Sequence, residues 1–245
     1  MKQFAFICLF SLTILAGCAT SNYVDVQNQK YRIGAAHGAD LGSIGYLRKE
    51  GRNLYEQQIL PNYSGYSIKI KTDAVMNDEE TRKIDTALKA EIEAYKTKLK
   101  LIYGGNYWKT VTYHIIQIKS KYDLVKIYNN NPKILNFLKS SKDARIVTGV
   151  LIGFGDKESK TLNAGGDLEL NTSTVTPSIT ANYDHTRNFS FDDGAILAYI
   201  YDRVCWTTDK KGNLQIQCLI TDNPGWDSGA CPDGSCIDPR NPPKR

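Results

Sequence analysis

The sequence predicts an α+β fold, in which an α/β sandwich with the element order β-α-β-α-α-β is followed by antiparallel β hairpins. Three observations predict it. A capped amphipathic helix follows a short alternating strand, two apolar strands flank two further helical stretches, and the composition becomes rich in Gly, Thr, Ser and Asn from about residue 160. We expect the sandwich to span residues 66–155 and the whole folded domain to span residues 31–222.

The first predicted strand and helix carry the clearest local signals. Ile68 and Ile70 alternate with lysines, which is the pattern of a strand with one buried face. Asn77 then precedes a helix, and Glu80 completes a capping-box pattern with it. Acidic residues fill the first turn and lysines the end, which matches the helix dipole. The apolar stripe at helical spacing consists of Ile84, Leu88, Ile92, Tyr95 and Leu99.

Two strands and two helices complete the predicted sandwich. Residues 109–119 alternate as a strand, and residues 145–154 are apolar on both sides, which is typical of a central strand. Between them, helical stretches are predicted at about 121–129 and 132–140, and Pro132 is well placed at a helix start.

Strand pairs are predicted for most of the remaining chain. Alternation within residues 160–192 indicates antiparallel hairpins, and residues 195–206 fit a helix or a strand, with a strand favoured for the second half. A membrane-inserting hairpin of an oligomeric pore is the alternative for 160–192. It is disfavoured because Pro177 interrupts the alternation and polar residues would face lipid. In the Pro- and Gly-rich tail, residues 223–245, we expect order only around a small disulfide loop.

The beginning of the chain has the features of an export signal. Lys2 is followed by an apolar run that is shorter than the roughly 20 residues of a membrane-spanning helix. The run ends in the sequence Leu-Ala-Gly-Cys, whose last residue is Cys18. This motif resembles the lipobox of bacterial lipoproteins. The resemblance implies removal of residues 1–17 and attachment of a diacylglycerol to the Cys18 thiol, with acyl chains such as palmitate holding the protein to a bilayer.

The same resemblance implies an address in the cell envelope. Ala19 follows the lipidated cysteine, and in Gram-negative lipoproteins a residue other than Asp there implies sorting to the outer membrane. We expect residues 18–30 to form a lipidated tether. The glycine-rich residues 34–45 are expected to form a small-residue loop or a short packed helix, since they lack the G-x-G-x-x-G spacing of a dinucleotide-binding loop.

Four cysteines remain for disulfide bonds, apart from the one in the signal and the lipidated one. Three connectivities are possible. Cys205 and Cys218 lie opposite each other if residues 210–213 form a turn. Cys231 and Cys236 enclose a Pro-Asp-Gly-Ser turn sequence. We therefore expect these two local bonds, with a structural role, because neither pair has the C-x-x-C spacing of redox-active sites.

The sequence contains no complete catalytic or metal-binding pattern. None of the three histidines, His37, His114 and His185, belongs to an H-E-x-x-H motif or accompanies a C-x-x-C motif. The nucleophile motifs G-x-S-x-G and S-x-x-K and the phosphate-loop motif are also absent from the sequence. Asp184 beside His185 is the best candidate for an oriented general base, although a solvated turn is the favoured interpretation. We therefore predict no catalytic residue, metal or cofactor.

One further resemblance bears on chemistry. Residues 67–128 run strand, long helix with a tyrosine, Gly-Gly, strand and short helix with Tyr122 and Tyr128. This order is similar to the N-terminal part of zincin-type peptidase domains in exported bacterial proteins. The resemblance implies a following helix whose H-E-x-x-H histidines bind zinc. The corresponding residues, 192–199, contain no histidine, which argues against an active zinc peptidase.

Charge and composition narrow the class of partner. The formal net charge of +5 falls to +4 without Lys2, and basic residues are interleaved with acidic ones, so nucleic acid is not expected as a partner. The 15 tyrosines suit half-buried binding surfaces. The sequence thus favours a membrane-anchored envelope lipoprotein with a non-catalytic binding or assembly role and an envelope protein partner. The alternatives are an envelope hydrolase with dispersed catalytic residues and, less favoured, an oligomeric pore component.

Overall fold

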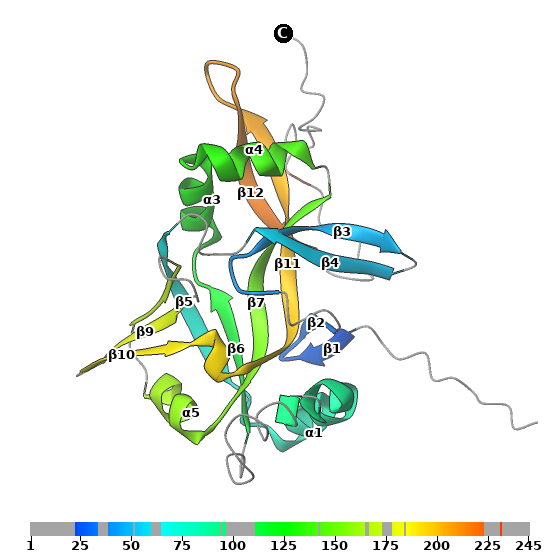
Figure 1. The fold of residues 1–245 in the computed structure, drawn as a ribbon, viewed down its shortest axis with the longest axis vertical. Helices are drawn as coiled ribbons and strands as arrows, with labels where there is room; N and C mark the ends of the chain where they lie inside the picture. The colour runs from blue at the N-terminus through cyan, green and yellow to red at the C-terminus, as the bar shows by residue number, and fades with distance from the viewer. Residues whose placement is uncertain are drawn as a thin grey trace, which may run out of the picture.

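Two long apolar strands, β7 (Ala144–Phe154) and β11 (Ala195–Thr208), pair with each other at the centre of the fold (Figure 1). β7 is buried along nearly its whole length because β11 lies on one side of it and β6 and β3 on the other. The computed structural model describes residues 23–33, 39–50, 52–59, 65–93, 95–96, 111–141, 143–164, 167–172, 178–183, 185–222 and 231.

Every strand pairing in the described part of the chain is antiparallel. The main strand order is β1-β2-β11-β7-β6-β5-β8-β9-β10, while β12 pairs with β11, and β3 joins β4 to β7. The other strands are β1 (Tyr23–Val26), β2 (Gln29–Ile33), β3 (Ile44–Glu50), β4 (Arg52–Ile59), β5 (Ser67–Ala74), β6 (Thr112–Ile118), β8 (Asp167–Asn171), β9 (Ser178–Tyr183), β10 (His185–Ser190) and β12 (Leu214–Thr221).

Three of the described helices begin where the sequence supplies a side-chain cap. Asn77 accepts hydrogen bonds from the backbone N–H groups of Glu79 (2.8 Å) and Glu80 (3.4 Å), which confirms the predicted start. Asn131 caps the helix that opens with Pro132 in the same way. No helix of the described residues is long and apolar enough to cross a bilayer. The helices are α1 (Asp78–Ala87), α3 (Lys121–Asn129), α4 (Pro132–Ser140), α5 (Asp156–Asn163) and the short 3-10 helix η3 (Phe191–Asp193).

The sheet carries a hydrophobic cluster on each face. The larger cluster includes buried residues of α3 and α4, which lie towards the upper end of the molecule in Figure 1. The second cluster includes the predicted stripe residues Ile84, Leu88 and Ile92 together with Val24 and Val26 of β1. Burial of these side chains on both faces supplies the main favourable free energy of folding.

The predicted α/β sandwich is wrong, although many of its elements exist. β5 and β6 are antiparallel neighbours, and so are β6 and β7. The helices between these strands therefore do not cross the sheet to a parallel strand, as they would in a βαβ unit. The fold is one mostly antiparallel sheet with few helices. The prediction failed because the order of strands and helices along the sequence does not show in which direction neighbouring strands run.

Two other regions differ from expectation, and at two more the structure selects one of the alternatives that the sequence left open. Residues 23–30 were expected within the tether, but Tyr23–Val26 form β1 and β2 begins at Gln29. The small-residue run at 34–45 is described only from residue 39, where it forms a turn that leads into β3 and no helix. Residues 195–206 are strand throughout, and α5 was not predicted.

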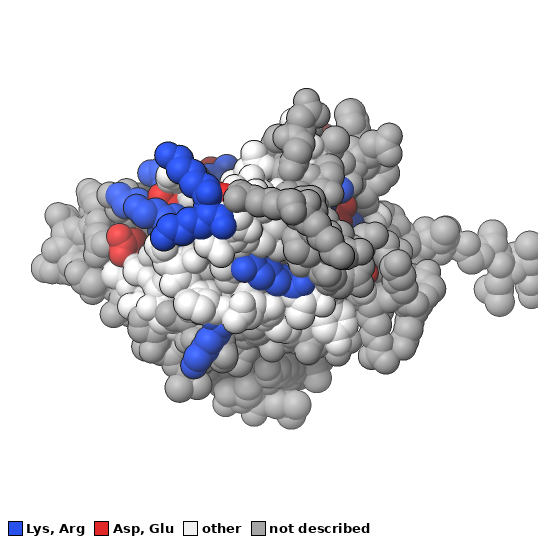
Figure 2. All heavy atoms as spheres, turned by 90° about the horizontal axis from the view of Figure 1, so that it is seen from above, with Lys and Arg blue, Asp and Glu red and all other residues white. Residues whose placement is uncertain are grey.

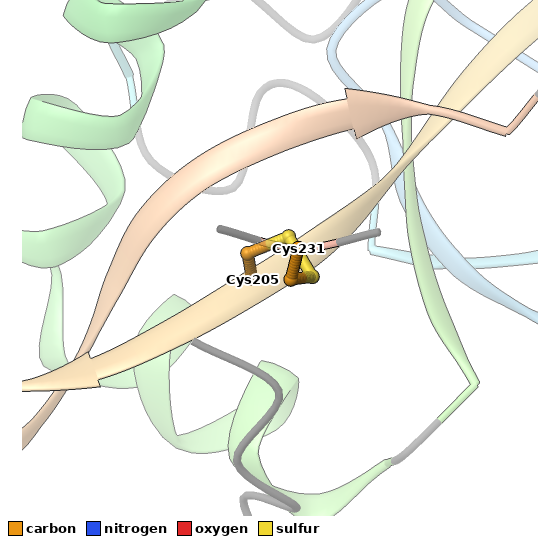
Figure 3. The surroundings of a disulfide bond; sticks show 2 residues. All are labelled: Cys205 and Cys231. Atoms are coloured by element: carbon orange, nitrogen blue, oxygen red, sulfur yellow. A yellow bond between two sulfur atoms is a disulfide. The ribbon is translucent and has the colours of Figure 1, made fainter. Parts of the chain in front are cut away.

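The expected pairing of the cysteines is also wrong. Cys205 and Cys218 do stand opposite each other as Cα partners in the β11–β12 pair, as the turn predicted. The disulfide, however, joins Cys205 to Cys231, and Cys218 is a free thiol (Figure 3). This bond also excludes the predicted Cys231–Cys236 pair, while Cys236 lies outside the described residues. The opposed positions of Cys205 and Cys218 permit a bond between them, but the bond goes to Cys231.

Candidate functional site

A polar cleft of about 420 Å³ lies on the face of the sheet that carries the second hydrophobic cluster. Alternation along the strands places it there. On β6, Tyr113 and Ile115 belong to the cluster beneath α1, whereas Gln117, on the same face further along, lines the cleft. The cleft therefore occupies the part of this face that α1 leaves open. Its lining residues are Asn28, Gln29, Lys30, Lys71, Gln117, Ile118, Lys119, Lys121, Thr148, Gly149, Ile200 and Thr221.

Among the residues that the structure describes, four lysines and no acidic residue line the cleft. Lys30 comes from β2, Lys71 from β5, and Lys119 and Lys121 flank the start of α3. Within the described part of the chain, no carboxylate lies at ion-pair distance from Lys30, Lys71 or Lys119. Three positive charges thus converge on one hollow without a partner, which makes the cleft attractive to anions.

The fourth lysine is held by a buried carboxylate. Lys121 Nζ lies 2.6 Å from Asp202 Oδ2, and the Asp202 side chain is fully buried. Thr148 Oγ1 donates to Asp202 Oδ1 at 2.9 Å, and Lys121 Nζ donates to Thr221 Oγ1 at 2.7 Å. A buried charge is tolerated only when it is paired and hydrogen-bonded, so this network fixes the Lys121 ammonium at the edge of the cleft.

Amide and phenol groups form another wall of the cleft. Gln117 Nε2 donates to Tyr31 OH at 3.2 Å and also contacts Gln29 Oε1, while Tyr31 OH donates to Gln29 Oε1 at 3.1 Å. Gln117 lies over Gly149, where an added Cβ would come within 3.2 Å of Gln117 Cγ. Burial raises the pKa of Tyr31 well above its usual range, and the hydrogen bond from Gln117 opposes this shift. The phenol therefore stays protonated at neutral pH.

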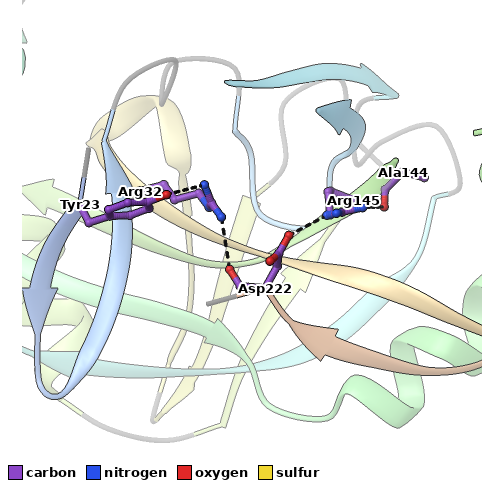
Figure 4. Close-up of polar contacts among 5 residues, drawn as sticks. All are labelled: Tyr23, Arg32, Ala144, Arg145 and Asp222. Carbon is purple, nitrogen blue, oxygen red and sulfur yellow. Dashed lines mark hydrogen bonds and ion pairs between the residues drawn. The ribbon is translucent and has the colours of Figure 1, made fainter. Parts of the chain in front are cut away.

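A cluster of arginines and tyrosines ties together the strands that frame the cleft (Figure 4). Arg32 of β2 stacks over the Tyr201 ring, 4.3 Å from its centroid, and donates to Tyr23 OH at 3.0 Å. Arg145 Nε pairs with Asp222 Oδ2 at 3.0 Å. Arg32 also reaches the backbone carbonyl of Asp222 at 3.5 Å. These contacts hold β2, which carries Lys30, against the end of β12, which carries Thr221.

The end of the molecule that carries α4 is charged in a different way. Figure 2 looks down on this end and shows Lys and Arg gathered mainly at the upper left, with Asp and Glu among them, and further basic side chains near the middle and at the lower left. Exposed lysines of this region include Lys126 and Lys133 of the helices and Lys210 and Lys211 of the β11–β12 turn. A hollow of about 310 Å³ between α3 and β12 at this end contains one lysine, Lys126, among the described residues, whereas the cleft contains four, so the cleft is the better candidate site.

A second polar pair, His114 and Ser159, is closed to substrates. His114 Nε2 lies 3.1 Å from Ser159 Oγ, and both side chains are buried. Burial lowers the pKa of His114 to about 4. His114 Nδ1 has no hydrogen-bond partner among the described residues, so the pair lacks the third group that orients the base in a triad. The pair has the properties of a core contact between β6 and α5.

The residues singled out in the sequence are not brought together. His37, Asp184, Cys18 and Cys236 lie outside the described residues, and His185 is described only as part of the backbone of β10. Residues 192–199, which correspond to the zinc-binding helix of the zincin resemblance, form the end of η3 and the start of β11. The described residues contain no group of three or more His, Cys, Asp or Glu placed to hold a metal ion.

The sequence did not indicate that the lysines of the cleft form one site. The alternation of β5 correctly placed Lys71 on the open face, with Ile68 and Ile70 buried. The same alternation in β6 places Gln117 and Lys119 on that face, so the sequence pattern alone could have placed these two residues beside Lys71. The sequence alone does not place Lys30 in the cleft, because β2 reaches the cleft only through its pairing with β11.

Comparisons of the chain with protein-family models, with curated proteins and with solved structures found no match. The function therefore rests on the geometry of the described residues together with the motifs of the sequence.

Proposed function

We propose that this protein is a non-catalytic, lipid-anchored protein of the cell envelope whose folded domain binds an anionic ligand in the lysine-lined cleft. One observation carries the proposal. Lys30, Lys71 and Lys119 surround a hollow of about 420 Å³ and have no carboxylate partners in the described structure. Like charges held close repel one another, and a bound anion offsets that repulsion.

The anchor sets where this binding takes place. The lipobox resemblance at Cys18 supports attachment to an envelope membrane, the outer membrane in a Gram-negative organism, where the ligand is an envelope component or a group carried by an envelope protein. A non-catalytic role is supported by the burial of the His114–Ser159 pair, which keeps these two side chains out of contact with a ligand in the cleft. An exchange of Cys18 for Ser should move the protein from the membrane fraction to the soluble fraction.

The binding proposal is tested by the thermal unfolding of the full-length protein in a neutral detergent. We expect at least one of phosphate, citrate and glucuronate to raise the unfolding temperature, because a ligand at 100 times its Kd stabilises the folded state by about 2.7 kcal/mol. The neutral sugar glucose should have no effect. No stabilisation by any of these anions would refute the proposal.

A pair of matched variants ties the effect to the cleft. Lys71→Glu with Lys119→Glu should abolish the stabilisation, since both side chains are exposed and their replacement leaves the core intact. Lys157→Glu with Lys210→Glu changes the net charge equally at exposed positions that do not line the cleft, and should leave the stabilisation unchanged. Equal responses of the two double variants would show that the cleft is not the binding site.

A further inference from the structure

We infer that the ligand of the cleft is a phosphate ester of a sugar or polyol, an inference that rests on the proposed function and narrows it to a chemical class. The charges are the first reason. Three lysines lack a carboxylate partner in the described structure, and a phosphate monoester carries about −1.5 to −2 charges at neutral pH whereas a carboxylate carries one. A doubly charged group neutralises the cleft more completely.

The type and arrangement of the cations are the second reason. The basic residues of the lining among the described residues are all lysines, which bind phosphate as point charges. Lys30 comes from β2, whereas Lys71 and Lys119 come from β5 and the end of β6, so the ammonium groups reach the cleft from two sides of the β11–β7 pair. A tetrahedral group accepts hydrogen bonds from several directions, which suits this arrangement better than a planar anion does.

The start of α3 adds to the positive field. Lys119 and Lys121 both line the cleft, and they flank Ser120, the N-cap of this nine-residue helix. The N-terminal end of a helix carries a partial positive charge and favours phosphate groups. The helix end therefore adds to the positive charge of Lys119 on this side of the cleft.

The size and the neutral lining indicate what the phosphate is attached to. A volume of about 420 Å³ is within the range of roughly 300–1,000 Å³ found for small-molecule sites, and a lone phosphate ion would not fill it. The amides of Asn28, Gln29 and Gln117 and the hydroxyls of Thr148 and Thr221 supply neutral polar groups around the charges. Amides both donate and accept hydrogen bonds, as the hydroxyl groups of a sugar or polyol do.

Calorimetric titration tests this inference on the full-length protein in a neutral detergent without a sugar head group. The probes are glucose 6-phosphate, glucuronate and glucose, which share a ring and differ in charge. We expect glucose 6-phosphate to bind about tenfold or more tightly than glucuronate, and glucose to give no binding heat. Added salt should weaken the binding of glucose 6-phosphate more than that of glucuronate, because the more highly charged probe is more strongly screened.

Single variants assign the binding to the cleft. Lys71→Gln and Lys119→Gln should each weaken glucose 6-phosphate about tenfold, a loss expected when one charge contact is removed from a partly enclosed site. Lys210→Gln, at an exposed turn position, should leave the affinity unchanged. If both cleft variants bind glucose 6-phosphate as the unaltered protein does, the inference is overturned.

The outcomes separate this inference from the proposed function. Glucuronate binding as tightly as glucose 6-phosphate would overturn the phosphate class and leave anion binding in place. A lack of glucose 6-phosphate binding, with citrate still stabilising the protein through Lys71 and Lys119, would likewise overturn the phosphate class and leave anion binding in place. If no anion binds, both proposals fail.

Phosphatidic acid, a lipid whose head group is a phosphate monoester, added to the same micelles identifies the source of the phosphate ester. Its displacement of bound glucose 6-phosphate would support a lipid head group, and a lack of displacement would support a soluble sugar phosphate. Both results are compatible with the phosphate class.

Discussion

Joint replacement of Cys205 and Cys231 by alanine tests which cysteines close the C-terminal region. The bond spans a sequence separation of 26 residues. In the chain-entropy description, closing a loop of this length in the unfolded state stabilises the folded protein by about 3.5 kcal/mol. Because Cys205 is fully buried, truncating its side chain adds about 1 kcal/mol of lost packing. The double variant should therefore lose about 4 kcal/mol of unfolding free energy.

Urea-induced unfolding of the full-length protein, followed by far-UV circular dichroism without reductant, measures this loss. Cys218→Ala is the matched control, since its thiol is free and half-buried, and it should cost less than about 1 kcal/mol. Peptide mapping without reductant should find the peptide of Cys205 joined to that of Cys231. A cost for Cys218→Ala equal to that of the double variant, together with a mapped 205–218 link, would refute the observed pairing and restore the one that the turn sequence predicted.

Two further predictions concern buried polar groups. Tyr128→Phe removes the 2.8 Å hydrogen bond from Tyr128 OH to the carbonyl of Gly42 and should lower the free energy of unfolding in urea by about 1 kcal/mol. Tyr122→Phe, at an exposed position, should leave the free energy of unfolding unchanged. Equal losses in the two variants would contradict this prediction. Burial lowers the pKa of His114 from 6.5 to about 4, so between these pH values the unfolded state binds more protons than the folded state. The free energy of unfolding should fall by up to about 3 kcal/mol as the pH drops through this window. His114→Gln should make the free energy of unfolding less dependent on pH in this range. An unchanged pH dependence in this variant would exclude His114 as the cause.

Local signals in the sequence predicted the starts of α1, α3 and α4, because a cap acts within a few residues, whereas α5, which has no side-chain cap, was not predicted. Asn77 and Asn131 each bind the first N–H groups of their helices, and Pro132 fixes the first position of α4. The bounds predicted for α3 and α4, at 121–129 and 132–140, match the structure. These interactions depend on no distant part of the chain.

The N-terminal hairpin escaped prediction because its turn lacks the usual residues. Gln27 and Asn28 connect β1 to β2, and both have positive φ angles, 49° and 61°. A two-residue turn with both positions left-handed favours Asn-Gly, and Gln at the first position gives no such signal. Once this hairpin is missed, β2 is missing from the sheet and so is Lys30 from the cleft.

The direction of the strands escaped prediction for a different reason. A strand, a helix and a second strand follow one another in both parallel and antiparallel arrangements, and only contacts across the sheet decide between them. Here β5 also pairs with β8, and β7 with β11, partners that are far away in the sequence. The cleft has the same origin, since the residues of β2, β5 and α3 meet only after the sheet has formed.

If the chain is exported, as proposed above, the position of Cys218 opposite Cys205 bears on how the bond to Cys231 forms. A chain threaded through a membrane from its N-terminus delivers Cys205 and Cys218 before Cys231. The first two are Cα partners in the β11–β12 pair, so the hairpin brings their thiols together while the rest of the chain is still in transit. The bond seen in the structure is to the cysteine that arrives last. Maturation would then require the early 205–218 bond to be held off or exchanged, a task suited to a thiol–disulfide isomerase acting on the newly delivered chain.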